Sequence, residues 1–334
     1  MGASLAERTS GARVALVGSG SSYGHVVRQA LVDFGVPGSR VDLYGVAVGD
    51  EPVISEYAGE ARLIQQPEVG ELTSRDVVFL CEAGGVVDDL FGSSNCAHVS
   101  IVDVVHARPA GRPARLVHMD VNPAAATAGD TRVLAVPHDL STLLVDLLHP
   151  LDAEFGCEEA IAFVLRPASD AGQSGVDELR RQTVGLLNFA STPTEVFGRQ
   201  LAFNIVPQSE VGESGVESRI AEEVATLLGW DRRRLSLSLG FAPVFFGHTV
   251  QLRVRTERSS SAEALRAVFA LAGLVPDADD PRTTPMDVST EKRRCISRVA
   301  DDGSGGYWLW AVAGEARVRN AELAVRLADA VCAL

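Results

Sequence analysis

Short apolar runs alternate with helically spaced segments in the first part of the chain. The run at 13–17 (RVALV) ends in glycine and has the length and β-branched content of a buried parallel strand. After a glycine-rich turn, apolar residues recur at helical spacing over 25–34. Further strands are expected at 41–46, 77–81, 99–104 and 116–119. Strands that alternate with helices predict right-handed crossovers and a parallel sheet.

The pattern changes after about residue 137, where longer helical segments mix with strands. Helices are expected at 140–148, 175–188, 216–228, 262–272 and 320–333, and strands at 160–165, 235–239, 250–254, 296–299 and 308–313. In the segment 175–188, Val176, Leu179, Val184 and Leu187 are expected to share one face of the helix. The two patterns predict an α/β chain in which a parallel sheet is followed by a mixed sheet.

Composition narrows the functional classes. The 334 residues suggest about two domains, and the 30 Lys and Arg against 44 Asp and Glu give a formal net charge of −14. A surface with that charge repels nucleic acid and anionic lipid. No apolar stretch reaches the roughly 18 residues of a membrane span and the N-terminus has no secretory pattern, so we expect a cytoplasmic protein. Five scattered cysteines without a C-x-x-C pair favour reduced thiols, and no metal is expected.

The glycine-rich turn after the first strand is a candidate dinucleotide site. Its pattern is G-x-G-x-x-x-G, one residue longer than the common fingerprint, and the candidate contacts are Gly18, Gly20, Ser21, Ser22, Tyr23 and Gly24. Such a turn brings backbone N–H groups to a pyrophosphate at the positive end of a helix. The alternative is a tight turn that only packs the helix against the sheet. The second strand ends without a carboxylate or an arginine for the cofactor ribose, so binding of NADP or NAD is expected to be weak or absent.

Several segments carry a family resemblance in their residues and in their order. They are GVDELRRQTVGLLN (175–188), QLAFNIVPQ (200–208), APVFFGHTVQLRVRTER (242–258), TTPMDV (283–288) and YWLWAVAGEARVRNAELAV (307–325), with looser matches at CEAGG (81–85) and HMDVNP (118–123). In this order they resemble aspartate-semialdehyde dehydrogenase along most of the chain. The resemblance implies a Rossmann-type NAD(P)-binding domain at 1–136, completed by 317–334, and an α+β dimerisation domain of the catalytic type at 137–316. It adds Gly84 to the cofactor-binding residues and implies a homodimer or a tetramer that pairs through an open sheet.

The resemblance also implies a chemistry that this chain lacks the means to perform. In the family, a cysteine thiolate attacks the aldehyde, a histidine handles the proton, hydride passes to NADP, and phosphate resolves the thioester. The corresponding stretch here is AVPHDLST (135–142), in which Asp139 or Leu140 takes the place of the cysteine, depending on a one-residue gap. Neither side chain can form a thioester, because that bond needs a thiolate. The thioester route is therefore expected to be closed.

Other positions that match the family's site depart from it as well. Arg166 stands where the family has a glutamine, and Phe241 stands where it has the arginine that pairs with the substrate carboxylate. Arg219 keeps the charge of a family lysine, and Arg108 lies near a stretch that holds phosphate in the family. These three arginines are candidates to bind a small acidic ligand. His248 is retained in FFGHT, either as a general acid and base or as a histidine kept for packing.

Two functions remain open at this point. The first is a dimeric binding or scaffold protein that keeps the fold and has lost the chemistry, of the kind called Usg proteins. The second is a repurposed NAD(P)H-dependent reductase of a C=O or C=N group, with His248 as the general acid and no covalent intermediate. Ordinary aspartate-semialdehyde dehydrogenase activity is disfavoured by the missing cysteine. Tyr23, Phe241 and Phe246 could fill the nicotinamide space in a pseudoenzyme, whereas a reductase must leave that space open.

Overall fold

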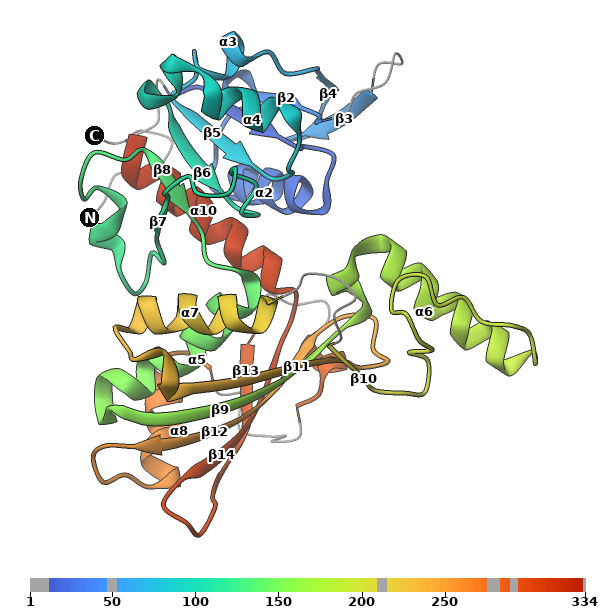
Figure 1. Cartoon of the computed structure of the whole chain (residues 1–334), viewed down its shortest axis with the longest axis vertical. Coiled ribbons are helices and arrows are strands. Elements are labelled where there is room, and N and C mark those ends of the chain that lie inside the picture. Colours follow the sequence, from blue (N-terminus) through green and yellow to red (C-terminus); the bar gives the residue numbers. More distant parts are fainter. Residues whose placement is uncertain (1–11, 47–52, 209–214, 275–282, 289–293, 333–334) are drawn as a thin grey trace. The chain divides into compact units, whose positions relative to one another are not determined.

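The computed structural model describes residues 12–46, 53–208, 215–274, 283–288 and 294–332. The chain forms two compact units, one made of residues 1–142 with 317–334 and the other of residues 143–316 (Figure 1). Each unit contains its own six-stranded sheet, and the predicted α/β fold class is confirmed.

The first unit is built on a parallel sheet. Its strands are β1 (Val14–Val17), β2 (Val41–Tyr44), β5 (Val77–Leu80), β6 (Ser100–Asp103), β7 (Arg115–Leu116) and β8 (Val133–Ala135). They lie in the order β2-β1-β5-β6-β8-β7, and all pairs are parallel. The strand order reverses direction between β1 and β5, and ligands of open α/β sheets bind outside the carboxyl ends of the strands at such a switch point.

Helices complete this unit. They are α2 (Ser22–Asp33), α3 (Val69–Leu72), α4 (Gly85–Gly92), α10 (Ala316–Cys332) and the short 3₁₀ helices η1 (Gly38–Arg40), η2 (Ser94–His98) and η3 (Pro123–Ala126). Leu323 and Leu327 of α10 are fully buried in the same apolar core as Leu16 and Val27. The last helix of the chain therefore belongs to the core of the first sheet.

A hairpin at the edge of the first unit was absent from the sequence prediction. Its strands are β3 (Val53–Tyr57) and β4 (Glu60–Ile64), and Val53, Ile54 and Leu63 are exposed. Strand prediction relies on the contrast between a buried and a solvated face, and a hairpin with so many exposed apolar residues offers little of that contrast.

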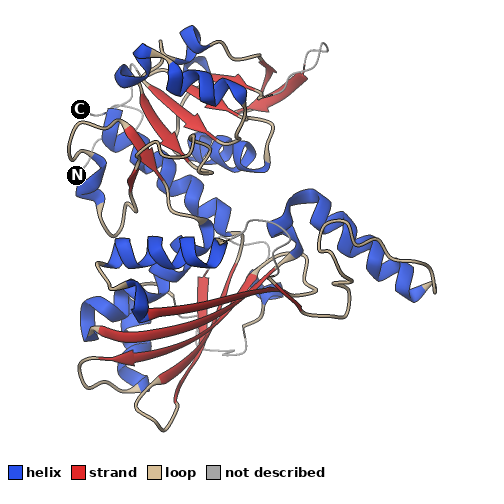
Figure 2. Cartoon of the chain, in the orientation of Figure 1, coloured by secondary structure: helices blue, strands red, loops and turns tan. Residues whose placement is uncertain are grey.

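The second unit contains a mixed sheet (Figure 2). Its strands are β9 (Cys157–Arg166), β10 (Val206–Pro207), β11 (Leu235–Phe241), β12 (His248–Thr256), β13 (Arg294–Asp301) and β14 (Tyr307–Ala313). They lie in the order β10-β11-β9-β12-β14-β13, with β9 and β11 parallel and the other pairs antiparallel. The accompanying helices are α5 (Asp139–Phe155), α6 (Gly172–Leu187), α7 (Val216–Leu228), α8 (Ala262–Leu271), α9 (Pro285–Val288), η4 (Ala168–Ala171) and η5 (Arg232–Arg234).

One face of this sheet is exposed, and we call it the open face. Along β9, Ala160, Ala162 and Val164 are buried, whereas Ile161 and Phe163 between them are about two-fifths exposed. Strand register places Trp308 on the same side, because Ile161 and Trp308 both lie opposite one residue of β12. On the other face, α7 packs against β11 and α8 against β13. The open face thus presents an aromatic and aliphatic centre.

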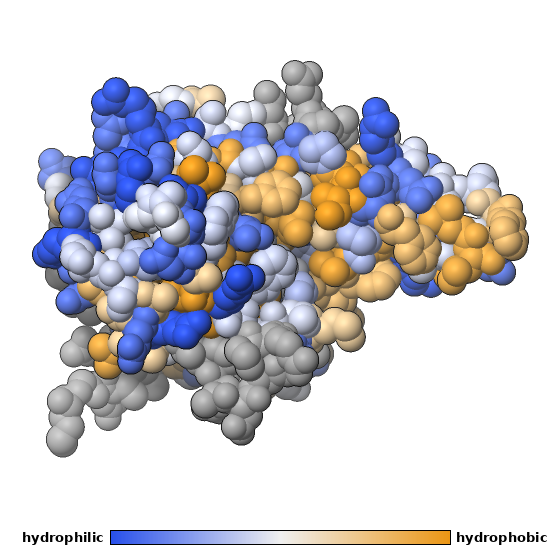
Figure 3. All heavy atoms as spheres, turned by 90° about the horizontal axis from the view of Figure 1, so that it is seen from below, coloured by the Kyte–Doolittle hydropathy of each residue, from blue (hydrophilic) through white to orange (hydrophobic). Residues whose placement is uncertain are grey.

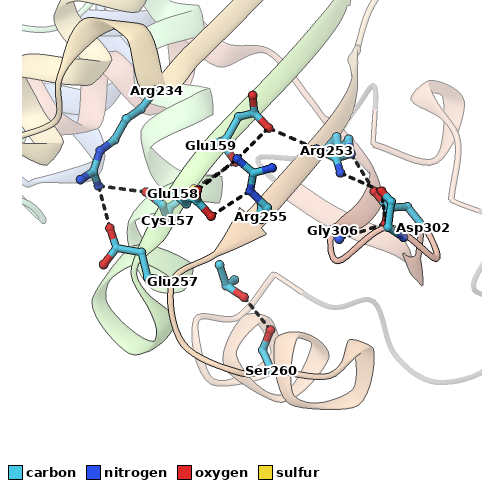
Figure 4. Close-up of polar contacts among 12 residues, drawn as sticks. Cys157, Glu158, Glu159, Arg234, Arg253, Arg255, Glu257, Ser260, Asp302 and Gly306 are labelled. Carbon is cyan, nitrogen blue, oxygen red and sulfur yellow. Dashed lines mark hydrogen bonds and ion pairs between the residues drawn. The ribbon is translucent and has the colours of Figure 1, made fainter.

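The charges at one end of the open face are paired within the chain (Figure 4). Arg253 forms ion pairs with Glu159 at 3.3 Å and with Asp302 at 2.7 Å. Arg255 beside it pairs with Glu158 at 2.8 Å. A second molecule on this face would meet paired charges at that end.

Two helices differ from their predictions. Helix α5 was expected to end at 148, but it continues through Pro150 to Phe155, although proline lacks the N–H that an inner turn uses. In α6 the expected shared face is wrong. Leu179 is buried, but Val184 and Leu187 are 55% and 67% exposed, because the inner face is occupied by the polar residues Glu178 and Gln182.

Candidate functional site

The glycine-rich turn after β1 is tightly packed at two of its three glycines. Gly18 has a left-handed backbone (φ +80°), and a Cβ there would lie 2.4 Å from the Cβ of Glu82. A Cβ on Gly24 would lie 2.2 Å from the carbonyl oxygen of Gly18. Gly20 has nothing nearer than a methyl group of Ile64 at 3.8 Å. Gly18 is therefore required by the close approach of residues 81–82 after β5, and Gly24 by the close approach of α2 to the turn, whereas Gly20 is not required by packing.

Helix α2 begins earlier than the sequence suggested. Ser21 is its N-cap, and its Oγ accepts a hydrogen bond from the N–H of Gly24 at 3.0 Å and donates one to the carbonyl of Cys81 at 3.0 Å. Gly24 accordingly lies in the first turn of the helix, and not in the loop before it. Gly20 and Ser22 are exposed at this N-terminus, where the helix dipole favours an anion such as a pyrophosphate.

The neighbouring glycine suits a dinucleotide less well. A Cβ on Gly84 would lie 1.9 Å from a methyl group of Val46, so the valine packs directly on this glycine. Val46 follows β2, where a dinucleotide-binding fold places a group that binds the ribose, and its side chain offers no polar atom. The rest of the predicted ribose-binding stretch, 47–49, lies outside the described residues. The N-terminus of α2 therefore suits a pyrophosphate, and the Val46 side chain supplies no polar contact for the ribose.

The N-terminus of α5 forms a second cluster in the first unit. The Asp139 carboxylate accepts a hydrogen bond from the Tyr23 hydroxyl and another from the amide of Asn320 at 2.8 Å. Asn320 is fully buried and also donates to the carbonyl of Pro137 at 2.6 Å. His138 Nδ1 accepts the N–H of Leu140 at 3.1 Å, and the Leu140 side chain is fully buried. Tyr23 therefore spans from the glycine turn to the first turn of α5.

Arg108 is held by a carboxylate of its own unit. Asp103, at the end of β6, is fully buried and accepts hydrogen bonds from the N–H of Ala107 at 2.8 Å and from the Arg108 guanidinium at 3.0 Å. The charge of Arg108 is thus balanced inside the unit. Its pairing leaves less net attraction for an acidic ligand than a lone arginine would offer.

In the second unit, His248 lies at the start of β12 and is 1% exposed. Its Nε2 is 3.0 Å from Asp170 Oδ1, and its Nδ1 is 3.4 Å from the carbonyl oxygen of Gly314. Burial by itself lowers the pKa of His248, but the Asp170 carboxylate and, beyond it, Glu315 outweigh that effect and raise the pKa above its ordinary value. A raised pKa favours the imidazolium form.

Asp170 binds Arg166 as well as His248. Burial alone would raise the pKa of Asp170, but His248 and Arg166 hold it well below its usual range. Arg166 donates from Nε to Asp170 Oδ2 at 2.8 Å and from another guanidinium nitrogen to Gln208 Oε1 at 2.8 Å. We call these four residues, Gln208, Arg166, Asp170 and His248, the His248 network. It brings together two predicted site residues, His248 and Arg166, through a carboxylate that the sequence analysis missed.

Aromatic side chains close the network on one side. The Arg166 guanidinium lies 4.7 Å from the centre of the Phe241 ring, and that ring meets Phe197 edge-on at 5.2 Å. Phe246 is 44% exposed. Arg219, the remaining predicted arginine, lies half-buried in the first turn of α7. One signal for Asp170 was available in the sequence, since it follows Arg166 by four residues, a spacing that suits an ion pair within a turn.

Cys81, Cys96, Cys157 and Cys295 are free thiols, and the first three have raised pKa values. Burial raises the pKa of Cys81, it raises that of Cys157 to about 12, and it raises that of Cys96 against a smaller opposing effect of Arg112. A nucleophilic cysteine needs a lowered pKa. These three thiols therefore stay protonated at neutral pH.

Comparison with known proteins identifies the family of the chain. The family model described as semialdehyde dehydrogenase, dimerisation domain, matches residues 148–315. The chain belongs to the semialdehyde dehydrogenase family. It is 26% identical over 325 residues to the USG-1 protein homolog of Azotobacter vinelandii, covering 95% of this chain and 96% of that protein. It is 23% identical over 329 residues to the aspartate-semialdehyde dehydrogenase of Rickettsia conorii, with 95% and 96% covered.

Solved structures of semialdehyde dehydrogenases share the fold. Aspartate semialdehyde dehydrogenase II of Vibrio cholerae superposes with a TM-score of 0.84 at 23% identity, covering 96% of this chain and 97% of that one. A probable aspartate-semialdehyde dehydrogenase of Pseudomonas aeruginosa gives 0.80 at 26% identity, with 95% and 97% covered. The predicted resemblance is confirmed at the level of the family. No helix within the described residues is both long and apolar enough to cross a membrane.

Proposed function

We propose that this member of the semialdehyde dehydrogenase family is a dimeric binding protein that does not carry out the family's thioester chemistry. The proposal rests on the hydrogen bonding and burial of the residues at the N-terminus of α5. Asp139 or Leu140 stands where the resemblance places the nucleophile. The Asp139 carboxylate is held by Tyr23 and Asn320, and Leu140 is fully buried. Neither offers a nucleophile that could form a thioester.

The His248 network supports the same conclusion from the second unit. A general acid must present its proton to a substrate within hydrogen-bond reach. His248 is buried, and its Nε2 is directed at Asp170. Arg166 is directed at Asp170 and Gln208 in the same way. Both residues are held by partners in their own unit, which favours a structural role over the repurposed reductase.

The resemblance implies a nicotinamide cofactor, which would supply hydride transfer when bound. Gly20 and Ser22 would hold the pyrophosphate at the N-terminus of α2. Val46 provides no contact for a ribose, and Tyr23 is committed to Asp139. We infer that NADP and NAD bind weakly or not at all.

The dimer is supported by the open face of the second sheet. Ile161, Phe163 and Trp308 are each about two-fifths exposed there. Aromatic residues are enriched at protein interfaces, and neighbouring exposed apolar residues mark interaction sites. A second copy is the natural occupant, since the matched family domain is described as a dimerisation domain.

The direct test is an activity assay on the full chain. Purified protein is mixed with aspartate semialdehyde, NADP and phosphate, and NADPH formation is followed by absorbance. We expect no turnover above a protein-free blank, and turnover of about 1 s⁻¹ or more, ordinary for an enzyme, would refute the proposal.

A cofactor titration tests the reductase alternative. A ligand that binds only the folded state stabilises it by about 2.7 kcal/mol at one hundred times its dissociation constant. NADPH and NADH at millimolar concentration should leave the melting temperature unchanged. A clear rise with either would favour the reductase, and the His248→Gln variant in a carbonyl and imine screen would then decide whether His248 takes part.

A further inference from the structure

A pocket lies in the first unit at the amino edge of the parallel sheet, and we call it the amino-edge pocket. Its lining comes from three connections that lead into strands, 93–97 before β6, 112–113 before β7 and 130–132 before β8, together with Phe91 and Val133. The strands are parallel, so these connections meet at one edge, whereas the glycine-rich turn after β1 lies at the carboxyl edge. We propose that this pocket binds the phosphate group of a small phosphorylated ligand, independently of the proposed function.

The size of the pocket suits a small molecule. Its volume is about 300 Å³, at the lower end of the range for ligand pockets. Figure 3 shows a different kind of surface, on which apolar residues form a broad area across the middle and right of the view. A broad apolar surface suits a protein partner, whereas a small concave pocket with charged groups suits a small polar ligand.

Two guanidinium groups give the amino-edge pocket an excess of positive charge. Arg112 donates from Nη2 to the carbonyl oxygen of Phe91 at 2.7 Å, which anchors its guanidinium at the end of α4. Arg132 is exposed, and neither arginine forms an ion pair with a carboxylate of the described residues. Asp130 is the one carboxylate of the lining, so two positive charges face one negative charge in a chain whose net charge is −14. Guanidinium groups bind phosphate through paired hydrogen bonds.

The hydroxyl groups of the lining are placed to donate. Ser93 Oγ accepts the N–H of Asn95 at 3.2 Å, and Thr131 Oγ1 accepts the N–H of Val133 at 3.3 Å. Each hydroxyl also has one proton to donate, and contacts within the described residues leave that proton available. Ser94 adds a third hydroxyl to the lining. The matching ligand group therefore carries several acceptor oxygens.

The number of donors favours phosphate over carboxylate. A phosphate ester offers three terminal acceptor oxygens and roughly 1.5–2 negative charges at neutral pH, whereas a carboxylate offers two oxygens and one charge. Arg112 and Arg132 together can balance the larger charge. Phe91, Pro113 and Val133 supply apolar atoms that would contact the body of the ligand.

Cys96 provides a reporter inside the pocket. Its thiol is half-buried, lines the pocket and experiences the positive charge of Arg112. A phosphate bound to Arg112 would oppose that charge and cover the thiol, so it should slow alkylation by iodoacetamide. The experiment measures the labelling rate of Cys96 in the full chain at pH 8 by mass spectrometry of the peptides. Inorganic phosphate, glycerol phosphate and succinate are compared at constant ionic strength.

We expect saturating inorganic phosphate to slow the labelling of Cys96 at least about fivefold. Glycerol phosphate should reach the same protection at a lower concentration, because its body contacts the apolar part of the lining. Succinate should protect less. Labelling that neither phosphate compound slows, or that succinate slows equally, would overturn the proposal. Glycerol phosphate that protects no better than inorganic phosphate would overturn the assignment to a phosphorylated ligand in favour of the free ion.

Three variants test whether the protection comes from this pocket. Arg132→Gln removes an exposed guanidinium without an ion pair in the described structure, and it should raise the phosphate concentration for half-protection at least about tenfold. Asp130→Asn removes a carboxylate that repels phosphate, and it should lower that concentration. The matched control is Arg13→Gln, an exposed arginine of the same unit outside the pocket, which should change nothing. If Arg132→Gln is protected like the wild type, the pocket is not the phosphate site.

Discussion

Replacing Asp170 by asparagine should show how much the His248 network stabilises the second unit. Asp170→Asn keeps the shape of the side chain and removes its charge. Two cations lose their counter-ion, Arg166 at 2.8 Å and His248 at 3.0 Å, and the Asp170 side chain is only 9% exposed. Breaking a buried ion pair by removing one partner costs about 3–5 kcal/mol, because the remaining charge stays buried without compensation.

The two cations respond differently to that loss. His248 can release its proton, since burial then dominates its pKa and favours the neutral ring. Arg166 cannot be deprotonated in a protein, although it keeps Gln208 as a partner. We therefore expect a loss at the lower end of the range, about 3 kcal/mol. For a domain of roughly 150–250 residues this lowers the melting temperature by about 6–12 °C.

The assay is denaturant unfolding of the full chain, followed by circular dichroism. Asp177→Asn is the matched control, because Asp177 pairs with Arg180 at 3.7 Å on the surface of the same unit and both side chains are exposed. Exposed pairs contribute about 0–1 kcal/mol, so the control should unfold close to the wild type. If Asp170→Asn also unfolds within about 1 kcal/mol of the wild type, the network has no more effect than a surface pair and the reasoning is refuted.

Three further predictions concern other parts of the chain. The pKa of His248 is raised in the folded state, so the protonated ring stabilises the fold fully below about pH 6.5. This stabilisation is lost as the pH rises through the folded-state pKa, and the free energy of unfolding falls by at most about 1.4 kcal/mol per pH unit. Melting curves from pH 6 to 9 should show this decline for the wild type and a flatter profile for His248→Gln, and a flat wild-type profile would contradict it. Gly24→Ala should destabilise the first unit strongly, because the new Cβ lies 2.2 Å from a backbone oxygen, whereas Gly20→Ala should unfold within about 1 kcal/mol of the wild type; equal effects would show that the turn can adjust. Cys157, with a pKa of about 12, should resist iodoacetamide at pH 8 in the native protein and react in denaturant, as read by mass spectrometry of the peptides, and rapid native labelling would show that the thiol is accessible.

Local patterns in the sequence were enough to predict most regular elements. Helix α7 was predicted at 216–228 and lies there, and the strands β1, β9, β12 and β14 were found with shifts of a few residues at their ends. This works because burial on one face imposes a period of 3.6 or 2 on the residues of the element itself. The order of the family segments and the missing cysteine at 135–142 could likewise be read directly from the chain.

The partners of the polar residues were decided by the tertiary structure. Asp170 contacts His248, which lies 78 positions further along the sequence, and Tyr23 contacts Asp139, which lies 116 positions further. A local period of apolar residues cannot predict contacts between residues so far apart in the sequence. The outward face of α6 was decided in the same way, because Glu178 and Gln182 could be buried only once the return segment supplied N–H groups to satisfy them. The sequence by itself determined where most helices and strands form and to which family the chain is similar. Which charges are paired, and which apolar residues remain exposed for a partner, depended on contacts between distant segments, since a buried polar group is tolerated only where the fold provides its hydrogen bonds.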